Sequence, residues 1–144
     1  MSSLLTRDEY QNLADSLPLP TNAAIDGTAR AAQSGDTFET INPATGQVIA
    51  RIASCGQPDV DLAVEKAPLA FESGVWSRAH PSERKRVLRR LVKLMERDAH
   101  ELAVLETLES GKPIYDVETI DSPALPGMAR RSHRQALRPD VAFR

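Results

Sequence analysis

The longest helical pattern in the chain ends at Leu105-Glu106-Thr107-Leu108-Glu109-Ser110-Gly111-Lys112-Pro113. Gly111 favours the left-handed conformation with which many helices end, and Lys112 suits the negative end of the helix dipole. Pro113 cannot prolong a helix. The stretch therefore predicts a capped helix C-terminus. Whether Glu109 in its last turn also has a function depends on what the rest of the chain brings near it.

Two helical segments lead up to this end. Residues 82–97 form an amphipathic pattern that Ser82 is expected to cap, with basic side chains opposite an apolar stripe. Residues 98–110 continue with apolar side chains at helical spacing. We expect these two helices to be the hydrophobic centre of the chain. The stripe on the first helix consists of Val87, Leu88, Leu91, Val92 and Met95.

A third helical pattern begins at Pro58-Asp59, where the acidic residue suits the first turn of a helix. Pro68 lies inside this pattern, and an internal proline removes one hydrogen bond at a cost of ~3 kcal/mol. We therefore expect a kink or an early end at Pro68. One face of this helix is apolar and should pack against other elements; it consists of Val60, Val64, Ala67 and Phe71.

Strand signals lie in the first part of the chain. Residues 37–41 and 47–52 alternate in polarity and flank residues 42–46, Asn-Pro-Ala-Thr-Gly, which are turn formers. Residues 25–28, Ile-Asp-Gly-Thr, give a further strand-and-turn signal. Before them, Thr6 and Glu9 form a capping box for a short helix. The expected fold is mainly α-helical, with a strand-turn-strand near residues 37–52.

The composition is that of a globular chain, with 41% hydrophobic and 26% charged residues and a net charge of −2. So small a charge does not draw the whole molecule to nucleic acid or to an anionic membrane. No apolar run approaches the ~20 residues that span a bilayer. Cys55 is the only cysteine, which excludes an internal disulfide and a cysteine-based metal cluster. We expect a soluble, cytoplasmic protein.

No complete active site is visible in the sequence. Cys55 precedes a helix whose dipole could stabilise a thiolate, but no histidine stands at a recognisable spacing from it, so we interpret it as structural. His80 and His100 lack metal-ligand spacing and are expected at surface or capping positions. The basic face of residues 84–97 is diluted by acidic residues and contains no aromatic side chains for base stacking. A glycine-rich phosphate loop is absent.

Residues 122–144 differ in character from the rest. Their first part is rich in proline, and residues 128–144 contain five arginines without an apolar period. We expect this tail to be disordered.

Four motifs resemble the aldehyde dehydrogenase superfamily in sequence, order and spacing. The nearest branch is the one that acts on aminoaldehydes, including gamma-glutamyl-gamma-aminobutyraldehyde and betaine aldehyde. The resemblance implies an α/β fold in which residues 1–121 are the incomplete N-terminal part of a doubly wound cofactor domain. The motifs are Thr40-Ile41-Asn42-Pro43-Ala44-Thr45-Gly46, Asp59-Val60-Asp61-Leu62-Ala63-Val64, Ser82-Glu83-Arg84 and the stretch from Leu105 to Pro113.

The same resemblance implies an activity for the full-length enzymes. They oxidise an aldehyde through a cysteine thiohemiacetal, pass a hydride to NAD or NADP, and hydrolyse the thioester with the help of a glutamate. The residues for these steps come from later sequence, and Cys55 does not match the nucleophile motif. No catalytic or cofactor-binding residue is therefore assigned in this chain, and the isolated chain is not expected to bind NAD or NADP.

One site of the family has counterparts here. Related enzymes bind a monovalent cation through residues that match Thr40, Ile41 and Glu109. Two backbone carbonyls and a carboxylate are the oxygen ligands that a hard cation prefers. The family more often has aspartate at the position of Glu109. Two interpretations stay open for this residue, a cation ligand or a plain helix end.

The resulting expectation is a truncated NAD(P)-dependent aldehyde dehydrogenase, an oxidoreductase that is inactive as this isolated chain. Its partner would be an aldehyde in the full-length enzyme, in a homo-oligomeric family, with no nucleic acid or membrane partner. A frameshift near Asp121 would explain the tail, because suitable codons for residues 128–138 can spell the family's continuation one base later. The alternative is a noncatalytic helical interaction protein that uses the basic face of residues 84–97 and the arginine-rich tail.

Overall fold

The computed structural model describes residues 4–121, which form parts of two compact units. The described residues of the first unit are 4–17 and 79–121, and the second unit is residues 18–78. The tail of residues 122–144 lies outside the described residues.

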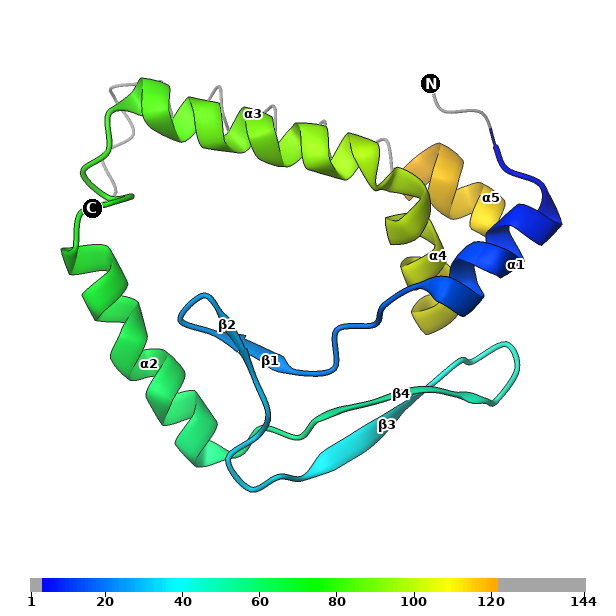
Figure 1. Cartoon of the computed structure of the whole chain (residues 1–144), viewed down its shortest axis with the longest axis horizontal. Coiled ribbons are helices and arrows are strands. Elements are labelled where there is room, and N and C mark those ends of the chain that lie inside the picture. The colour runs from blue at the N-terminus through cyan, green and yellow to red at the C-terminus, as the bar shows by residue number, and fades with distance from the viewer. Residues whose placement is uncertain (1–3, 122–144) are drawn as a thin grey trace. The chain divides into compact units, whose positions relative to one another are not determined.

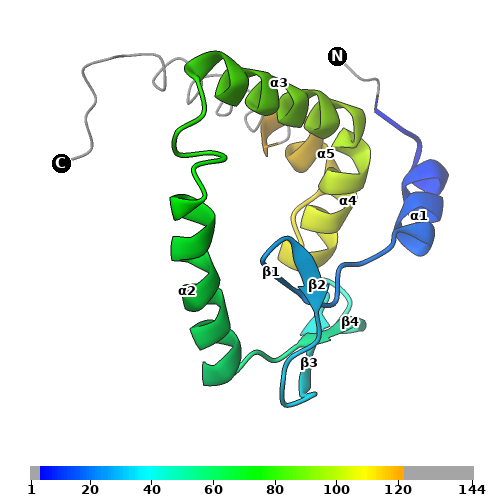
Figure 2. The same ribbon diagram turned by 60° about the vertical axis from the view of Figure 1, so that its left-hand side comes forward.

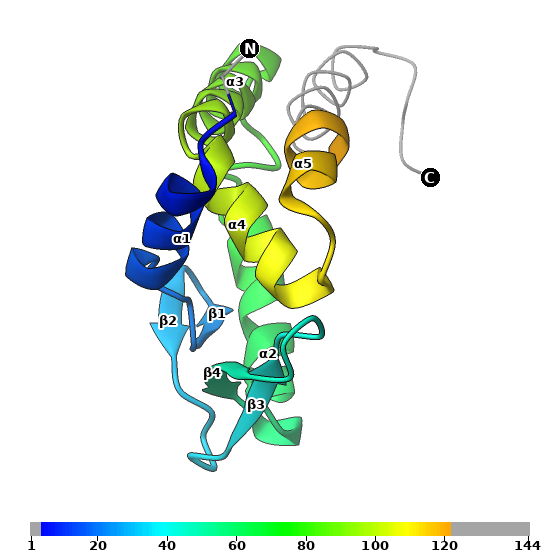
Figure 3. The same ribbon diagram turned by 90° about the vertical axis from the view of Figure 1, so that its right-hand side faces the viewer.

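The first unit is helical. It contains α1 (Arg7–Ser16), α3 (Pro81–Arg97), α4 (Ala99–Ser110), α5 (Ile114–Asp116) and a π-helical turn, Val117–Asp121 (Figure 1). Helix α4 is its centre, because α1, α3, α5 and the π-helical turn all contact it. Figure 3 shows α1 on one side of α4 and α5 on the other.

The core of the first unit lies around α4. Val92 of α3, Ala103 and Val104 of α4, and Val117 of the π-helical turn are buried, and Ala103 has no exposed surface. The prediction that residues 82–110 form the hydrophobic centre holds for α4. It is only partly right for α3, because Val87 and Leu91 of the predicted stripe remain 51% and 46% exposed.

Helix α1 begins as its capping box predicts. The backbone N–H of Thr6 donates to the Glu9 carboxylate at 2.7 Å, and the N–H of Glu9 donates to the Thr6 hydroxyl. These bonds hold the pKa of Glu9 below its ordinary value. The backbone N–H of Leu5 donates to the Tyr10 hydroxyl at 3.3 Å, which fixes the entry of the chain into the helix.

Helix α3 begins two residues earlier than predicted, because its N-cap is His80 and not Ser82. The Nδ1 atom of His80 accepts the backbone N–H of Ser82 at 3.3 Å, so Ser82 lies in the first turn. The reason is Pro81, which lacks an N–H and has a fixed φ that suits the first helical position.

The end of α4 confirms the prediction made from residues 105–113. Gly111 adopts a left-handed conformation, with φ +71°, and its N–H donates to the Thr107 carbonyl at 3.0 Å. Pro113 then precedes α5, and the two short helical elements of residues 114–121 were not predicted.

The second unit contains two hairpins and one helix. Strands β1 (Ala23–Ile25) and β2 (Thr28–Arg30) pair antiparallel across Asp26 and Gly27, whose φ values of +54° and +70° match a two-residue hairpin turn. Strands β3 (Thr37–Ile41) and β4 (Val48–Ala53) form the predicted strand-turn-strand, also antiparallel (Figure 2). The expected mainly helical fold with this hairpin is confirmed.

Helix α2 (Gln57–Glu72) contacts β1. The buried carboxylate of Asp59 accepts the backbone N–H groups of Gly56 and Gln33, each at 3.0 Å, and so ties the start of α2 to the loop after β2. The apolar face predicted to pack is exposed instead: Val60 is 50%, Val64 64% and Phe71 70% exposed. The prediction was wrong because helical periodicity groups residues on a face without showing what covers it.

Of the two alternatives predicted at Pro68, a kink or an early end, the early end is wrong, since the helix runs to Glu72. Its last carbonyls find partners beyond the helix. The Ser77 hydroxyl donates to the Phe71 carbonyl at 2.7 Å, and the Arg78 guanidinium donates to the Glu72 carbonyl at 2.5 Å. These bonds stabilise the final turn despite the hydrogen bond that Pro68 removes.

Candidate functional site

The first half of the predicted cation site is the end of β3. Thr40 pairs with Ala50 and Ile41 with Val48, so Ile49 is an extra residue on β4 and the ladder has a bulge at this point. Bulges interrupt the regular pairing of backbone groups and are common next to functional sites. The carbonyl groups of Thr40 and Ile41 therefore lie where the ladder is disrupted.

The turn that follows is fixed by local chemistry. The Asn42 side-chain oxygen accepts the N–H of Ala44 at 2.9 Å, and the Gly46 N–H donates to the Asn42 carbonyl at 2.8 Å. Gly46 has a φ of +71°, a conformation that favours glycine. The strand end that carries Thr40 and Ile41 is thus held by its own turn.

The second half of the predicted site is Glu109, an exposed residue in the last turn of α4. The nearby ammonium group of Lys112 lies 3.8 Å from the carboxylate of Glu106. Thr40 and Ile41 belong to the second unit and Glu109 to the first, and the cation site stays a prediction. Within residues 4–121, no cluster of three or more His, Cys, Asp or Glu side chains could hold a metal.

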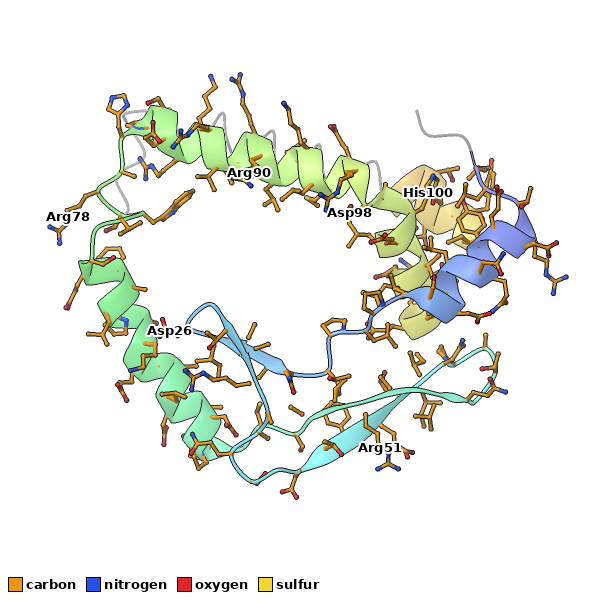
Figure 4. All side chains as sticks on the ribbon, viewed as in Figure 1. Asp26, Arg51, Arg78, Arg90, Asp98 and His100 are labelled. Atoms are coloured by element: carbon orange, nitrogen blue, oxygen red, sulfur yellow. The ribbon has the colours of Figure 1, made fainter. Side chains whose placement is uncertain are left out.

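A cluster that sequence reasoning missed joins three elements of the first unit. His100 Nδ1 of α4 lies 2.5 Å from the carboxylate of Glu118, whose side chain is only 7% exposed. The ring of Tyr10 in α1 meets the His100 ring edge-on, at 6.1 Å between centroids. His100 is labelled in Figure 4. Burial, followed by the neighbouring Glu118 carboxylate, raises the pKa of Tyr10. His100 and Glu118 are 18 residues apart in the sequence, and no local sequence pattern predicts a contact between them.

The other singled-out side chains carry no catalytic arrangement. Cys55 is exposed just before α2. His80 serves as a cap, as predicted, whereas His100 was not recognised as a partner of Glu118. The Ser82 hydroxyl lies 2.8 Å from Nδ1 of His80, but both side chains are exposed at the start of α3, where this nitrogen also accepts the Ser82 N–H as a helix cap.

A cavity of about 450 Å³ lies in the first unit among α1, α4 and α5. It is mainly apolar, and the hydroxyl of Thr107 on its wall is buried without a hydrogen-bond partner in the described part of the chain. Its lining includes Leu5, Tyr10, Ala14, Val104, Thr107 and Ile114. Apart from the phenols of Tyr10 and Tyr115 and the guanidinium of Arg7, such a lining offers mainly shape and apolar surface.

Helix N-termini bind phosphate through free N–H groups. Local side chains lie at three of them here, Glu9 and Thr6 at α1, Asp59 at α2 and His80 at α3, whereas α4 has no side-chain cap. Asp59 would also repel a phosphate group at the start of α2.

The basic face of α3 is partly neutralised by its own neighbours. The Arg86 guanidinium lies 2.6 Å from the Glu83 carboxylate, and Arg97 donates two hydrogen bonds to Asp98. The hydrogen bond from Arg97 holds the pKa of Asp98 below its ordinary value. None of the described helices is both long and apolar enough to cross a membrane.

Comparison with known proteins now assigns the chain. A profile described as "Aldehyde dehydrogenase family" matches residues 30–140, most of the sequence. The chain therefore belongs to the aldehyde dehydrogenase family, as its motifs predicted.

The relatives include enzymes for aminoaldehydes. An aminoacetaldehyde dehydrogenase of Pseudomonas aeruginosa is 48% identical over 123 residues, which cover 85% of this chain and 25% of the relative. The NADP/NAD-dependent aldehyde dehydrogenase PuuC of Escherichia coli is 43% identical over 121 residues, which cover 84% of this chain and 24% of the relative. This chain spans about a quarter of the length of these curated relatives.

Solved structures share the fold. An indole-3-acetaldehyde dehydrogenase of P. syringae, in complex with NAD+ and IAA, superposes with a TM-score of 0.89 at 40% identity, covering 98% of this chain and 29% of that one. A gamma-glutamyl-gamma-aminobutyraldehyde dehydrogenase of Burkholderia cenocepacia superposes with a TM-score of 0.88 at 40% identity. The match covers 96% of this chain and 27% of that one. The chain therefore has the fold of the corresponding quarter of an aldehyde dehydrogenase.

Proposed function

We propose that this chain supplies the N-terminal part of the cofactor domain of an NAD(P)-dependent aldehyde dehydrogenase that oxidises aminoaldehydes. The observation that carries the proposal is the 48% identity to an aminoacetaldehyde dehydrogenase over 85% of the chain. The likeness to a gamma-glutamyl-gamma-aminobutyraldehyde dehydrogenase supports the same substrate class. Taken by itself, the 144-residue polypeptide has no dehydrogenase activity in this proposal.

The role of the chain's own residues is structural. Asp59 holds the start of α2, and the bonds around Gly111 end α4 where Glu109 is needed. NAD or NADP would accept the hydride, as the name of the E. coli relative and the NAD+ complex of the P. syringae enzyme suggest for the family. In this proposal the groups that hold the cofactor lie in the part of the enzyme that this chain does not match, about three quarters of the relatives' length. With a single cysteine, the chain suits the cytoplasm.

A direct assay tests this function. The purified chain, mixed with aminoacetaldehyde and either NAD or NADP, should produce no reduced cofactor. A fusion of this chain to the remaining three quarters of the P. aeruginosa relative should produce it, with the intact relative as positive control. Turnover by the chain alone would contradict the claim of inactivity, and an inactive, folded fusion would contradict the family role.

We further propose that the Thr40 and Ile41 carbonyls and the Glu109 carboxylate bind a monovalent cation in the complete enzyme. The oxygen donors and the bulge at the end of β3 support this proposal. In the fusion, potassium should raise the melting temperature, and Glu109→Gln should remove that increase. Glu106→Gln, one turn earlier on α4, is the matched control. A potassium effect that survives Glu109→Gln unchanged would rule out Glu109 as a ligand.

A further inference from the structure

The cavity of about 450 Å³ in the first unit is lined by one side of each of two helices. On α1 and on α4 the lining residues recur three, four or seven positions apart, which places each set on one side of its helix. Helix α5 adds Ile114 and Tyr115. The volume lies within the range of small-molecule sites in proteins, roughly 300–1,000 Å³. The residues from α1 and α4 include Arg7, Gln11, Ala14, Val104, Thr107 and Leu108.

One polar group of this lining is left without a partner. The hydroxyl of Thr107 is buried and makes no hydrogen bond to any residue in the described part of the chain. The hydroxyl of Ser110 in the same helix, by contrast, donates to the carbonyl of Glu106 at 2.6 Å. A buried hydroxyl without a bond lowers stability, and a polar ligand atom beside it recovers that loss. Thr107 therefore marks a point at which a polar atom of a ligand fits.

The charge on the lining is positive. Arg7 is exposed, and its guanidinium pairs with no carboxylate within residues 4–121. The lining contains no aspartate or glutamate, and the nearby carboxylate of Glu9 is bonded to Thr6. A guanidinium group suits a carboxylate in both charge and geometry. Charge complementarity therefore favours an anionic over a cationic head group.

The rest of the lining favours an apolar ligand body. Leu5, Val104, Leu108 and Ile114 supply aliphatic surface, and the hydroxyl of Tyr10 already accepts the N–H of Leu5. Burying hydrocarbon against such surface is favourable in proportion to the area removed from water. A head group alone would gain nothing from it.

We propose that this cavity binds a small apolar carboxylate. The hydrocarbon part lies among the aliphatic side chains of the lining, the Thr107 hydroxyl donates to a carboxylate oxygen, and Arg7 balances the charge. The site lies in the first unit alone, and it does not depend on the dehydrogenase role proposed above.

The test is titration of the purified 144-residue chain with octanoate and with 3-phenylpropanoate, which separate an alkyl from an aryl ligand. Amide NMR shifts in α1, α4 and α5 should saturate with at least one of them, and the melting temperature should rise because the ligand binds the folded state. No saturation by about 10 mM ligand would overturn the proposal. So would equal shifts in the β3–β4 hairpin, or a spectrum without dispersed signals from α1 and α4.

The head group and the chain are tested separately. Octanoate should bind at least about threefold more tightly than octylammonium, and Arg7→Gln should remove most of that difference. Acetate, which has the head group without the chain, should not bind. Equal affinity for octanoate and octylammonium would overturn the assignment of a carboxylate, and acetate binding as tight as octanoate binding would overturn the apolar site.

Thr107→Val should have opposite effects on the empty and the loaded chain. Valine keeps the branched shape and removes the unpaired hydroxyl, so the urea midpoint of the empty chain should rise while octanoate affinity falls about fivefold. Thr119→Val is the control, because its hydroxyl already donates to the Tyr115 carbonyl at 2.7 Å. This control should not raise the midpoint. Unchanged octanoate affinity in Thr107→Val, or a lower midpoint, would overturn the role of this hydroxyl.

A cavity-filling variant tests the location without removing a polar group. Ala14→Leu adds apolar volume to the lining and should weaken octanoate binding by at least about tenfold, with the helical circular dichroism signal retained. Asn12→Leu, at an exposed position of α1 outside the lining, should leave binding unchanged. Equal effects of the two variants would overturn the assignment of the ligand to this cavity.

Discussion

The two units of the chain are stabilised in different ways. The first unit buries apolar side chains of α3, α4 and the π-helical turn, including Ala103 and Val117. The second buries few apolar side chains among its described residues, namely Ile25 and Ala32, and relies on hairpin pairing and on the buried carboxylate of Asp59. Its one helix turns the predicted apolar face to solvent. An amphipathic pattern therefore shows that a helix needs a partner, not that the partner lies in the same unit.

The largest expected effect comes from placing a charge in the core of the first unit. Ala103→Asp would bury an unpaired carboxylate where the native residue has no exposed surface, and it should cost roughly 3 kcal/mol or more. Ala67→Asp makes the same change on the exposed apolar face of α2 and should stay within about 0.5 kcal/mol. Urea unfolding, followed by circular dichroism, measures the free energy of unfolding of both variants. Similar losses of stability in the two variants would contradict the proposed difference between the units.

A smaller effect is expected when the polar anchor of the second unit is removed. Asp59→Ala leaves the N–H groups of Gln33 and Gly56 without their acceptor, which should cost about 2 kcal/mol. Amide exchange should quicken at both of these N–H groups while α4 keeps its protection. Asp61→Ala, which removes only a bond to the exposed Gln57 side chain, is the control. Unchanged exchange at Gln33 would show that Asp59 does not anchor α2.

The capping box of α1 should contribute less. Thr6→Ala should cost about 1 kcal/mol, measured by urea unfolding. The pKa of Glu9 is lowered in the folded state. The stabilisation that its carboxylate gives is therefore present above its ordinary pKa and is lost as the pH falls from there through the lower, folded pKa. In the Thr6→Ala variant this acid dependence should weaken, and an unaltered dependence would argue against the box.

The smallest effect concerns Tyr10. Its pKa is raised mainly by burial, so the folded state retains the phenol proton longer than the unfolded state does. This contribution is fully present below the ordinary tyrosine pKa of about 10 and is lost as the pH rises through the higher, folded value. Tyr10→Phe should flatten the alkaline part of the stability profile, and a profile identical to that of the native chain would exclude Tyr10 as its source.

Features set by neighbouring residues were predictable from the sequence. The capping box at Thr6, the turn at Asn42 and the helix end at Gly111 depend on the chemistry of a few consecutive residues, and the structure has all three. The family motifs are local in the same sense, and the comparisons confirm the family that they indicated.

Features set by tertiary contacts were not predictable. The pair of His100 and Glu118 depends on how the π-helical turn meets α4, and the exposure of the apolar face of α2 depends on what lies against it. The proposed cation site has the same character. The bulge beside Thr40 and the helix end near Glu109 are each specified locally, and local patterns do not show whether they form one site.

Amide hydrogen exchange, on the isolated chain and on its fusion to the remaining three quarters of the P. aeruginosa relative, tests the central claim most directly. The account predicts slow exchange in α4 in both molecules. In α2, exchange should be fast in the isolated chain and slow in the fusion, because the rest of the enzyme covers the apolar face of α2 in the fusion. Equal protection of α2 in the two molecules would contradict the claim that this face is completed by the rest of an aldehyde dehydrogenase.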